Sequence, residues 1–358
     1  MQGSSAGGVG RHVARLAAGL VAAAHDVVVA APAAAREDFD LDSTGAGFEA
    51  VDVSDRPRPG HDALAVRRLR RLLRDADVVH AHGLRAGGLV ALALGPVLLS
   101  RRDGPRFVVT LHNIPVGGGA VAAATRVLER LVANRADVVL GVSGDLVDRM
   151  RKLGATAAER ALVPAPEGPG PRREAGDVRA ELGVEPGTRL LVTVARLAPQ
   201  KGLDLLLDAV TQVGGDHRVL AVVAGDGPLR EPLQQRVDAD GLPVRLLGRR
   251  SDAPDLMRAA DVVVVPSVWE GQPLVVQEAL RVGAPIVATD VGGTGEVSGP
   301  AAVLVPYGDP AALAAAVRSL LDDDARRLAL SAAARQRADA LPSDADALAQ
   351  VLRLYDGV

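Results

Sequence analysis

The chain has 358 residues, of which 48% are hydrophobic and 24% charged, and its formal net charge is −3. This length suits two domains of about 150 to 200 residues each, and the composition is typical of a folded globular protein. A nearly neutral charge argues against nucleic acid as the main partner, because nucleic-acid-binding surfaces carry a strong basic excess. The absence of cysteine excludes disulfides, thiolate zinc sites and a cysteine nucleophile.

The sequence also argues against a membrane-spanning segment and a secretory signal. The longest apolar run, residues 86–100, contains glycines and a proline and is shorter than the roughly 20 residues that cross a bilayer. It is expected to be a buried helix. Residues 1–10 lack the basic head and apolar stretch of a signal peptide. A cytoplasmic location is expected. Contact with the inner face of the membrane stays open, because the helix expected over residues 62–74 carries five arginines, although a solvated face is the favoured interpretation.

Taken in chain order, residues 7–10 (GGVG) are expected to form a loop that opens a helix over residues 11–23. No strand precedes this loop, which favours a start upstream of residue 1. Short β-branched runs then alternate with segments of helical period, a pattern typical of parallel sheets built from βαβ units. The expected strands cover residues 26–30, 48–53, 77–81, 107–111, 138–142, 190–195, 219–224, 244–247, 262–266, 286–289 and 303–305.

A domain boundary is predicted where prolines and glycines interrupt this alternation, in residues 164–171. We expect one doubly wound, Rossmann-like domain over residues 1–165 and a second over residues 166–340. A final helix over residues 341–358 is expected to pack back on the first domain. Ligands of such sheets bind beyond the carboxyl ends of the strands, so the strand-to-helix loops are the places to look for chemistry.

The most specific of these loops lies within VVVVPSVWEGQPLVVQE, residues 262–278. Glu270 is expected in the loop and Glu278 in the first turns of a helix whose free N–H groups, at Leu274 and Val275, can hold an anion. Two acids on either side of a helix start suit a ligand with sugar hydroxyls at one end, a ribose at the other and phosphates between. The alternative is that both acids are ordinary surface charges.

A second loop, VARLAPQKG at residues 194–202, carries Arg196 and Lys201 at the carboxyl end of a strand. Two cations there are well placed to neutralise a diphosphate, although a charge at a helix start need not have a ligand. Lysine occurs only at positions 152 and 201 among 41 basic residues, which favours a specific role for Lys201. The glycines at 225–227 and 292–293 lie at similar junctions and are ambiguous by themselves.

Three histidines also follow or end expected strands. His112 comes directly after the strand 107–111 and is the candidate for chemistry. His80 and His82 are expected on one face of a strand end, where they could form a metal pair, but no third ligand is near in sequence. Structural roles are therefore favoured for these two, and no metal site is predicted.

The ordered set of segments resembles the family 4 retaining glycosyltransferases. The matching segments, in the order and spacing of that family and over almost the whole chain, are GGVGRHVARLAAGLVAAAHDVVVAAP, ADVVHAHG, VVTLHNIP, VARLAPQKG, AGDGP, LLGRRSD and the acid pair. The resemblance implies the GT-B architecture, in which two Rossmann-like domains face each other across a cleft. It implies transfer of a hexose or N-acetylhexosamine, with retention, from a nucleotide diphosphate sugar, a UDP or GDP sugar first, without a metal or other cofactor.

The resemblance also implies a role for each candidate residue. The diphosphate would be held by Arg196, Lys201, the backbone N–H groups of Leu274 and Val275, and Gly8. Glu278 would bind the ribose and Glu270 the transferred sugar. The loop at Gly248 and Arg249 would lie near the base. His112 would donate to a hydroxyl of the donor sugar near its anomeric carbon.

Three departures from the family pattern remain: the missing first strand, the segment APEG after Val163 in place of Asn-Gly-Val-Asp, and Gln272-Pro273 where an aromatic residue and a glycine are common. Two other functions stay open, a nucleotide-sugar epimerase of the same architecture and a non-catalytic nucleotide-sugar sensor. The acceptor is not readable from the sequence, and a lipid-linked or anionic acceptor is a hypothesis.

Overall fold

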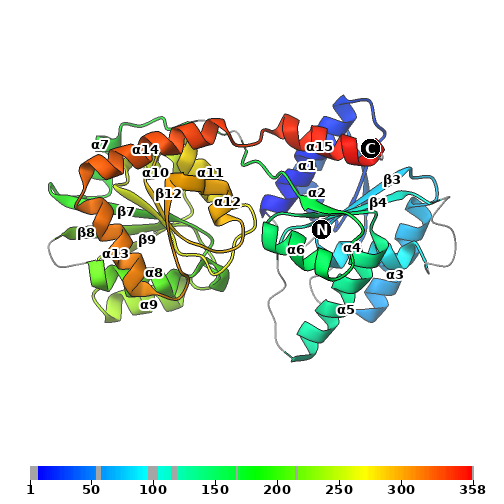
Figure 1. Cartoon of the computed structure of the whole chain (residues 1–358), viewed down its shortest axis with the longest axis horizontal. Coiled ribbons are helices and arrows are strands. Elements are labelled where there is room, and N and C mark those ends of the chain that lie inside the picture. Colours follow the sequence, from blue (N-terminus) through cyan, green and yellow to red (C-terminus); the bar gives the residue numbers. More distant parts are fainter. Residues whose placement is uncertain are drawn as a thin grey trace. The chain divides into compact units, whose positions relative to one another are not determined.

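A computed structural model describes residues 7–53, 58–95, 104–113, 119–166, 168, 170–213 and 217–356, without the side chains of residues 119–121. The chain divides into two compact units (Figure 1). The first unit comprises Met1–Pro164 and Pro342–Val358, and the second comprises Ala165–Leu341. The C-terminal segment thus belongs to the first unit, although it follows the second in sequence.

The second unit, over its described residues, is built on a parallel six-stranded sheet in the order β12-β11-β10-β7-β8-β9. Its strands are β7 (Thr188–Val194), β8 (Arg218–Ala224), β9 (Val244–Gly248), β10 (Val262–Val265), β11 (Ile286–Thr289) and β12 (Ala302–Val305). The inner strands are almost continuous runs of valine, leucine, isoleucine and alanine, as expected for strands that are covered on both faces. The order of connection reverses between β7 and β10, which makes the carboxyl ends of these strands the topological switch point.

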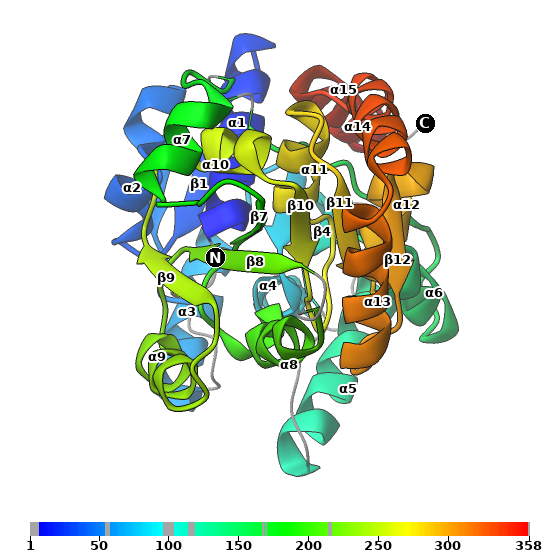
Figure 2. The same cartoon turned by 90° about the vertical axis from the view of Figure 1, so that its left-hand side faces the viewer.

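Two layers of helices cover this sheet (Figure 2). One face is covered by α8 (Leu203–Val213), α9 (Arg230–Ala239) and α13 (Pro310–Leu321). The other is covered by α7 (Ala175–Glu181), α10 (Ala253–Ala259), α11 (Leu274–Arg281) and α14 (Asp324–Asp339). The short helices η2 (Pro199–Lys201), α12 (Thr294–Ser298) and η3 (Gly299–Ala301) occupy loops.

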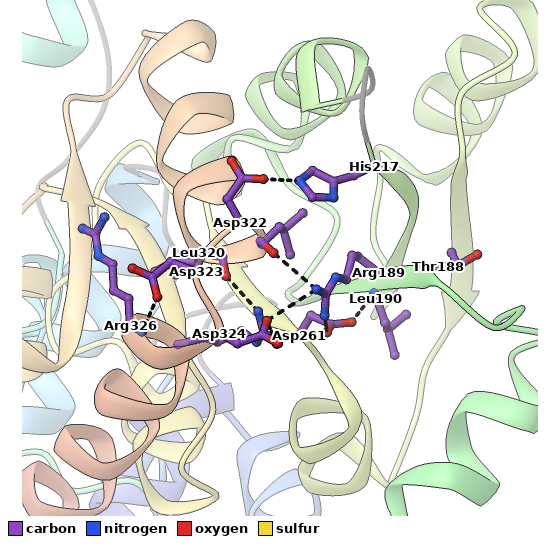
Figure 3. A network of polar contacts seen from close by, with 12 residues as sticks. Thr188, Arg189, Leu190, His217, Asp261, Leu320, Asp322, Asp323, Asp324 and Arg326 are labelled. Atoms are coloured by element: carbon purple, nitrogen blue, oxygen red, sulfur yellow. Dashed lines mark hydrogen bonds and ion pairs between the residues drawn. The ribbon is translucent and has the colours of Figure 1, made fainter.

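An ion-pair network fixes the amino edge of the same sheet (Figure 3). Asp261, directly before β10, accepts from the Leu190 backbone N–H at 2.7 Å and from Arg189 Nη1 at 3.1 Å. Arg189 also reaches Asp324 at the start of α14, at 3.4 Å. The network lies at the end of the strands opposite the switch point, so its role is to hold β7, β10 and α14 together.

The first unit contains two parallel sheets within its described residues. One pairs β1 (Val28–Ala31) with β2 (Gly47–Ala50), and the other has the order β3-β4-β5-β6. The strands of the second sheet are β3 (Val78–His82), β4 (Arg106–Leu111), β5 (Val138–Gly141) and β6 (Ala158–Arg160). The helices are α1 (Gly7–Ala22), α2 (Ala35–Asp38), η1 (Leu41–Thr44), α3 (Pro59–Leu72), α4 (Leu84–Ala93), α5 (Gly119–Arg135) and α6 (Gly144–Lys152).

The C-terminal helix α15 (Asp344–Asp356) packs on α1. Leu16 of α1 forms a buried cluster with Ala347 and Val351 of α15. Gln350 of α15 also accepts from the Leu162 backbone N–H at 3.0 Å and donates to the Arg160 carbonyl at 2.7 Å. Apolar packing and hydrogen bonds to the backbone therefore attach this helix to the first unit.

The predicted α/β class with two Rossmann-like, parallel-sheet domains is confirmed, and each predicted strand is present with ends that differ by at most three residues. Strand β6, with the sequence AER, was not predicted because it lacks β-branched residues. The predicted loop over residues 7–10 is wrong, since these residues form the first turn of α1. Gly10 serves packing there: a Cβ at this position would lie 2.3 Å from the Phe39 ring.

Two further predictions concern helices. The expected buried helix over residues 86–100 is α4, which ends at Ala93, and residues 96–100 lie outside the described ones. No helix in the described part of the chain is long and apolar enough to cross a bilayer.

Candidate functional site

The candidate site lies at the carboxyl edge of the second unit's sheet, where the loops after β7 and β10 meet. The Val268 backbone N–H donates to the Gln200 carbonyl at 2.9 Å, and the Gln200 side chain donates to the Trp269 carbonyl at 3.0 Å. The loop after β11 joins them, since the Gly293 N–H donates to the Glu270 carbonyl at 2.9 Å. Three loops from neighbouring strands are thus tied together at the switch point.

Glycines allow this close approach of backbones. Gly202 has a φ of 60°, and a Cβ there would lie 2.0 Å from the Pro266 carbonyl oxygen. Gly292 has a φ of 52°, and a Cβ there would lie 1.9 Å from the Glu270 carbonyl oxygen. Any other residue at these positions would meet both backbone strain and a collision with a carbonyl. The two glycines therefore have a steric role in the site.

Lys201 and Glu270 form an ion pair at the centre of these loops. Lys201 Nζ lies 2.6 Å from Glu270 Oε1, and the Ser267 hydroxyl donates to the same oxygen at 2.7 Å. The Glu270 side chain is 8% exposed and that of Lys201 24%. Burial of two charges is tolerated because they pair, and loss of either partner would leave the other uncompensated. The sequence assigned separate roles to these residues and did not predict their contact.

A small cavity of about 10 Å³ adjoins the pair. It has room for about one water molecule. Its lining includes Lys201, Ser267, Glu270 and Val275, together with residues at the carboxyl ends of β7 and β10. The site is thus nearly filled by its own side chains.

The amino terminus of α11 faces the same cavity through Val275. The Pro273 carbonyl accepts from the N–H groups of Val276 and Gln277, at 3.1 and 3.2 Å. The earlier N–H groups, at Leu274 and Val275, belong to the set that a helix start leaves without an intrahelical acceptor. Glu278, one turn further on, is half-buried. This arrangement can accept an anion at the helix start.

The remaining residues predicted for the donor site are spread over the structure. Arg196 is exposed in the loop after β7, and Arg249 is exposed after β9, two strands away in the sheet. Gly248, with a φ of 72°, accepts from the Gly225 N–H at 2.8 Å. Gly8 and His112 belong to the first unit. The structure therefore brings Lys201, Glu270 and Val275 into one cavity lining, with Arg196 in an adjoining segment.

The first unit holds a second polar feature, a cluster of four histidines. His12 of α1 lies with its ring centroid 5.8 Å from that of His82 and 5.9 Å from that of His112. The rings of His80 and His82 are stacked at 4.3 Å, and those of His82 and His112 at 5.4 Å. Sequence reasoning missed His12, because its position in a helix, 70 residues before His82, gave no signal of contact.

Hydrogen bonds connect this cluster to the sheet and to α15. His82 Nδ1 lies 3.1 Å from His112 Nε2. His80 Nδ1 lies 2.8 Å from the Tyr355 hydroxyl, and His80 Nε2 lies 2.7 Å from Thr110 Oγ1. His80 therefore has a hydrogen-bond partner for each ring nitrogen.

Burial keeps the four imidazoles neutral. Burial and, secondarily, the charge of Arg15 lower the pKa of His12 to about 4, and burial and then His12 lower the pKa of His80 to about 3. Burial, followed by the neighbouring histidines, holds the pKa of His82 and that of His112 well below 6.5. At neutral pH each ring therefore carries one N–H donor and one acceptor nitrogen.

Two other features bear on ligand binding. A cavity of about 420 Å³ is lined by Arg106, Val138 and Ala158, which begin β4, β5 and β6. It thus lies at the amino edge of its sheet, away from the edge where such folds bind substrates. Among the described residues, no group of three or more His, Cys, Asp or Glu could hold a metal ion. The pair His80 and His82 is instead engaged in the stacked cluster.

Comparisons with known proteins agree with this geometry. Residues 188–323 match the family described as glycosyl transferases group 1, and residues 7–166 match the glycosyl transferase 4-like domain. A glycogen synthase of Mycobacterium tuberculosis is 31% identical, with 95% of this chain and 88% of that protein covered. A D-inositol 3-phosphate glycosyltransferase of Kineococcus radiotolerans is 33% identical, with 75% and 69% covered.

Two solved structures support the fold. Anabaena HepE in complex with UDP has a TM-score of 0.80 and 22% identity, with 100% of this chain and 98% of that chain covered. The glycosyltransferase WaaG has a TM-score of 0.71 and 17% identity, with 97% and 96% covered. Both family matches, the relatives and the two parallel-sheet units lead to one conclusion: this chain is a glycosyltransferase and belongs to family 4, the group 1 type with the GT-B fold.

Proposed function

We propose that the chain transfers a hexose or N-acetylhexosamine from a UDP or GDP sugar to an acceptor, with retention at the anomeric carbon and without a metal ion. The observation that carries the proposal is the Lys201–Glu270 pair beside the start of α11, at the switch point of the second unit. Cations, a helix start and a carboxylate at such a point suit a diphosphate with a sugar attached.

Lys201 and α11 would stabilise the leaving diphosphate. An ammonium group has three N–H donors, and the bond to Glu270 uses one of them. The other donors would bind phosphate oxygens, together with the N–H groups of Leu274 and Val275. Arg196, in the same loop after β7, would add a second cation. These fixed charges act most strongly on the charge that develops as the glycosidic bond breaks.

Glu270 would have two tasks, one for each carboxylate oxygen. Its Oε1 accepts from both Lys201 and Ser267. Neither bond uses Oε2, which would accept from a hydroxyl of the transferred sugar. Glu278, on the next turns of α11, would bind the ribose hydroxyls, and the loop at Gly248 and Arg249 would lie near the base. Glu270 would thus couple the position of Lys201 to the position of the sugar.

The first unit would supply His112 and Gly8 to the donor. His112 would donate to a sugar hydroxyl near the anomeric carbon, and the backbone at Gly8 would approach the diphosphate. The acceptor hydroxyl would attack from the face that the diphosphate leaves, which gives retention. The HepE structures hold UDP, and in one case UDP-glucose, which favours a UDP sugar for this chain.

The experiment is a product analysis with a panel of α-linked UDP and GDP sugars in EDTA. The common acceptor is water, so the products are the free sugar and the nucleoside diphosphate. A freshly formed α-sugar, observed by proton NMR before mutarotation, is the expected result. A β-sugar would contradict retention, and a new nucleotide sugar would instead support an epimerase. Binding of a panel member without release of its diphosphate, in water and with acceptors of several classes, would support a sensor.

A further inference from the structure

In the histidine cluster of the first unit, His112 is in direct contact with a second histidine, His82. His112 follows β4 and is half-buried, whereas His82, at the end of β3, is buried. Within the described part of the chain, the His112 ring has one hydrogen-bond partner, His82, with His82 Nδ1 and His112 Nε2 3.1 Å apart. The two rings are also stacked, with an interplanar angle of 25°.

A hydrogen bond between two neutral imidazoles contains one proton, and its position decides what His112 offers to a substrate. If His112 Nε2 carried the proton, its Nδ1 could only accept. If His82 Nδ1 carries the proton, His112 Nε2 accepts it and His112 Nδ1 keeps its own N–H. A donor to a sugar hydroxyl requires the second arrangement.

We propose that His82 is a positioning residue, whose Nδ1–H donates to His112 Nε2 and thereby fixes the ring of His112 with its proton on Nδ1, toward the substrate. The proposal rests on the proposed function for the statement that this N–H meets the donor sugar. The tautomer itself is a property of the first unit.

His80 and Tyr355 support His82 in turn. His80 stacks on His82 at 4.3 Å with an interplanar angle of 27°, and its two nitrogens are fixed by Thr110 on β4 and by Tyr355 on α15. Burial raises the pKa of Tyr355, so its hydroxyl stays protonated. Tyr355 of the C-terminal helix is therefore connected to His112, 243 residues earlier in the sequence, through His80 and His82. The C-terminal helix thus helps to hold His112 in place.

The first test is ¹⁵N NMR of the full chain with labelled histidine, which reports the tautomer of each ring without any substrate. Its expected result is a proton on Nδ1 of His112 and on Nδ1 of His82. The ring signals are assigned by substitution. In His82→Leu, the His112 signals should shift toward a mixture of tautomers. A proton on His112 Nε2 in the wild type, or unchanged His112 signals in His82→Leu, would overturn the proposal.

The second test separates positioning from folding. With UDP-glucose, or the panel sugar that binds most tightly, His82→Leu should lower kcat for diphosphate release about 10- to 100-fold, as expected for a misplaced catalytic group. The Kd for UDP should stay unchanged, because Lys201, proposed to bind the diphosphate, and its partner Glu270 lie in the second unit and not in the histidine cluster. His82→Asn should recover most of the loss, since its amide N–H can replace Nδ1–H. An equal kcat for His82→Leu and wild type would overturn the proposal.

Matched controls exist for both supporting residues. Tyr355→Phe, which removes one hydroxyl, should lower kcat roughly two- to tenfold, whereas Tyr307→Phe, at an exposed tyrosine of the second unit, should not. His25→Leu, at an exposed histidine after α1, controls for loss of a histidine. A wild type that binds and cleaves no nucleotide sugar would contradict the proposed function, while the tautomer measurement still decides the role of His82.

Discussion

Acid should destabilise the first unit more than the second, because the buried histidines of the first unit resist protonation in the folded state. His12 and His80 have a pKa of about 4 and about 3 in the structure, against 6.5 in the unfolded chain. Above pH 6.5 neither state binds a proton at these groups, and their effect on stability is small. As the pH falls below 6.5, the unfolded chain takes up protons that the folded unit excludes, and stability is lost until the pH reaches the folded pKa.

The size of the effect at pH 5 follows from linkage. This pH is about 1.5 units below the unfolded pKa and still above both folded values, so each histidine lowers the free energy of unfolding by about 2 kcal/mol. The two contributions are not independent, since His12 contributes to the lowered pKa of His80. The pair should therefore cost about 3 to 4 kcal/mol between pH 7 and pH 5.

Hydrogen exchange measured by mass spectrometry can follow each unit in the intact chain. Peptides from β3 and β4 report the first unit, and peptides from β7 and β10 report the second. After correction for intrinsic exchange rates, protection of β3 and β4 should fall by two to three orders of magnitude from pH 7 to pH 5, the equivalent of that free energy. Protection of β7 and β10, which contain no histidine, should change far less.

The variant His12→Leu sharpens this test. It should remove about 2 kcal/mol of the pH-dependent loss, whatever its effect on stability at pH 7. The matched control is His61→Leu, at an exposed histidine of α3. An equal loss of protection in both units, or a pH dependence that His12→Leu leaves unchanged, would refute the conclusion that this cluster excludes protons.

Three further predictions concern the second unit. Gly202→Ala should lower the unfolding free energy of this unit by more than about 2 kcal/mol, because the new Cβ would meet the Pro266 carbonyl. The control Gly187→Ala, at a glycine with positive φ and open space around it, should cost only about 1 to 2 kcal/mol. Equal urea midpoints for the two variants would refute the steric role of Gly202. Glu270→Gln should lower stability by about 1 to 3 kcal/mol, since half-buried Lys201 loses its carboxylate, and an unchanged urea midpoint would contradict this role of the pair. Gln277→Leu should speed hydrogen exchange at Ala165, whose N–H donates to Gln277 Oε1 at 2.7 Å. Gln234→Leu, on α9, should not, and equal exchange in both variants would show that this bond does not order the segment between the units.

Much of the fold could be predicted from the sequence because its parallel strands are short β-branched runs between helical segments. Strand β11 was predicted with its observed ends, and β6 was missed because AER carries no strand signal. The loop predicted over residues 7–10 was wrong, because glycine there was interpreted as a turn residue. Gly10 is instead required by its packing against Phe39, 29 residues later. No local sequence pattern reveals this contact.

The candidate site could also be predicted only in part. The loops with Lys201 and Glu270 were found because strand ends carry charged residues in recognisable segments. Their ion pair joins residues 69 positions apart, and it depends on the order of β7 and β10 in the sheet. The bond between His80 and Tyr355 joins residues 275 positions apart. Sequence patterns report on local period and composition, so neither of these contacts could be predicted from them.

The most direct test of the central claim, a nucleotide-sugar site on the second unit, is calorimetric titration with UDP, GDP and their common sugars in EDTA. The wild type should bind one nucleotide series selectively. Lys201→Ala and Glu278→Ala should each weaken that binding by about 1 to 3 kcal/mol, while Lys152→Ala, which removes the other lysine of the chain, should leave it unchanged. Binding that survives in both site variants, or no binding of any nucleotide to the folded wild type, would contradict the proposed donor site.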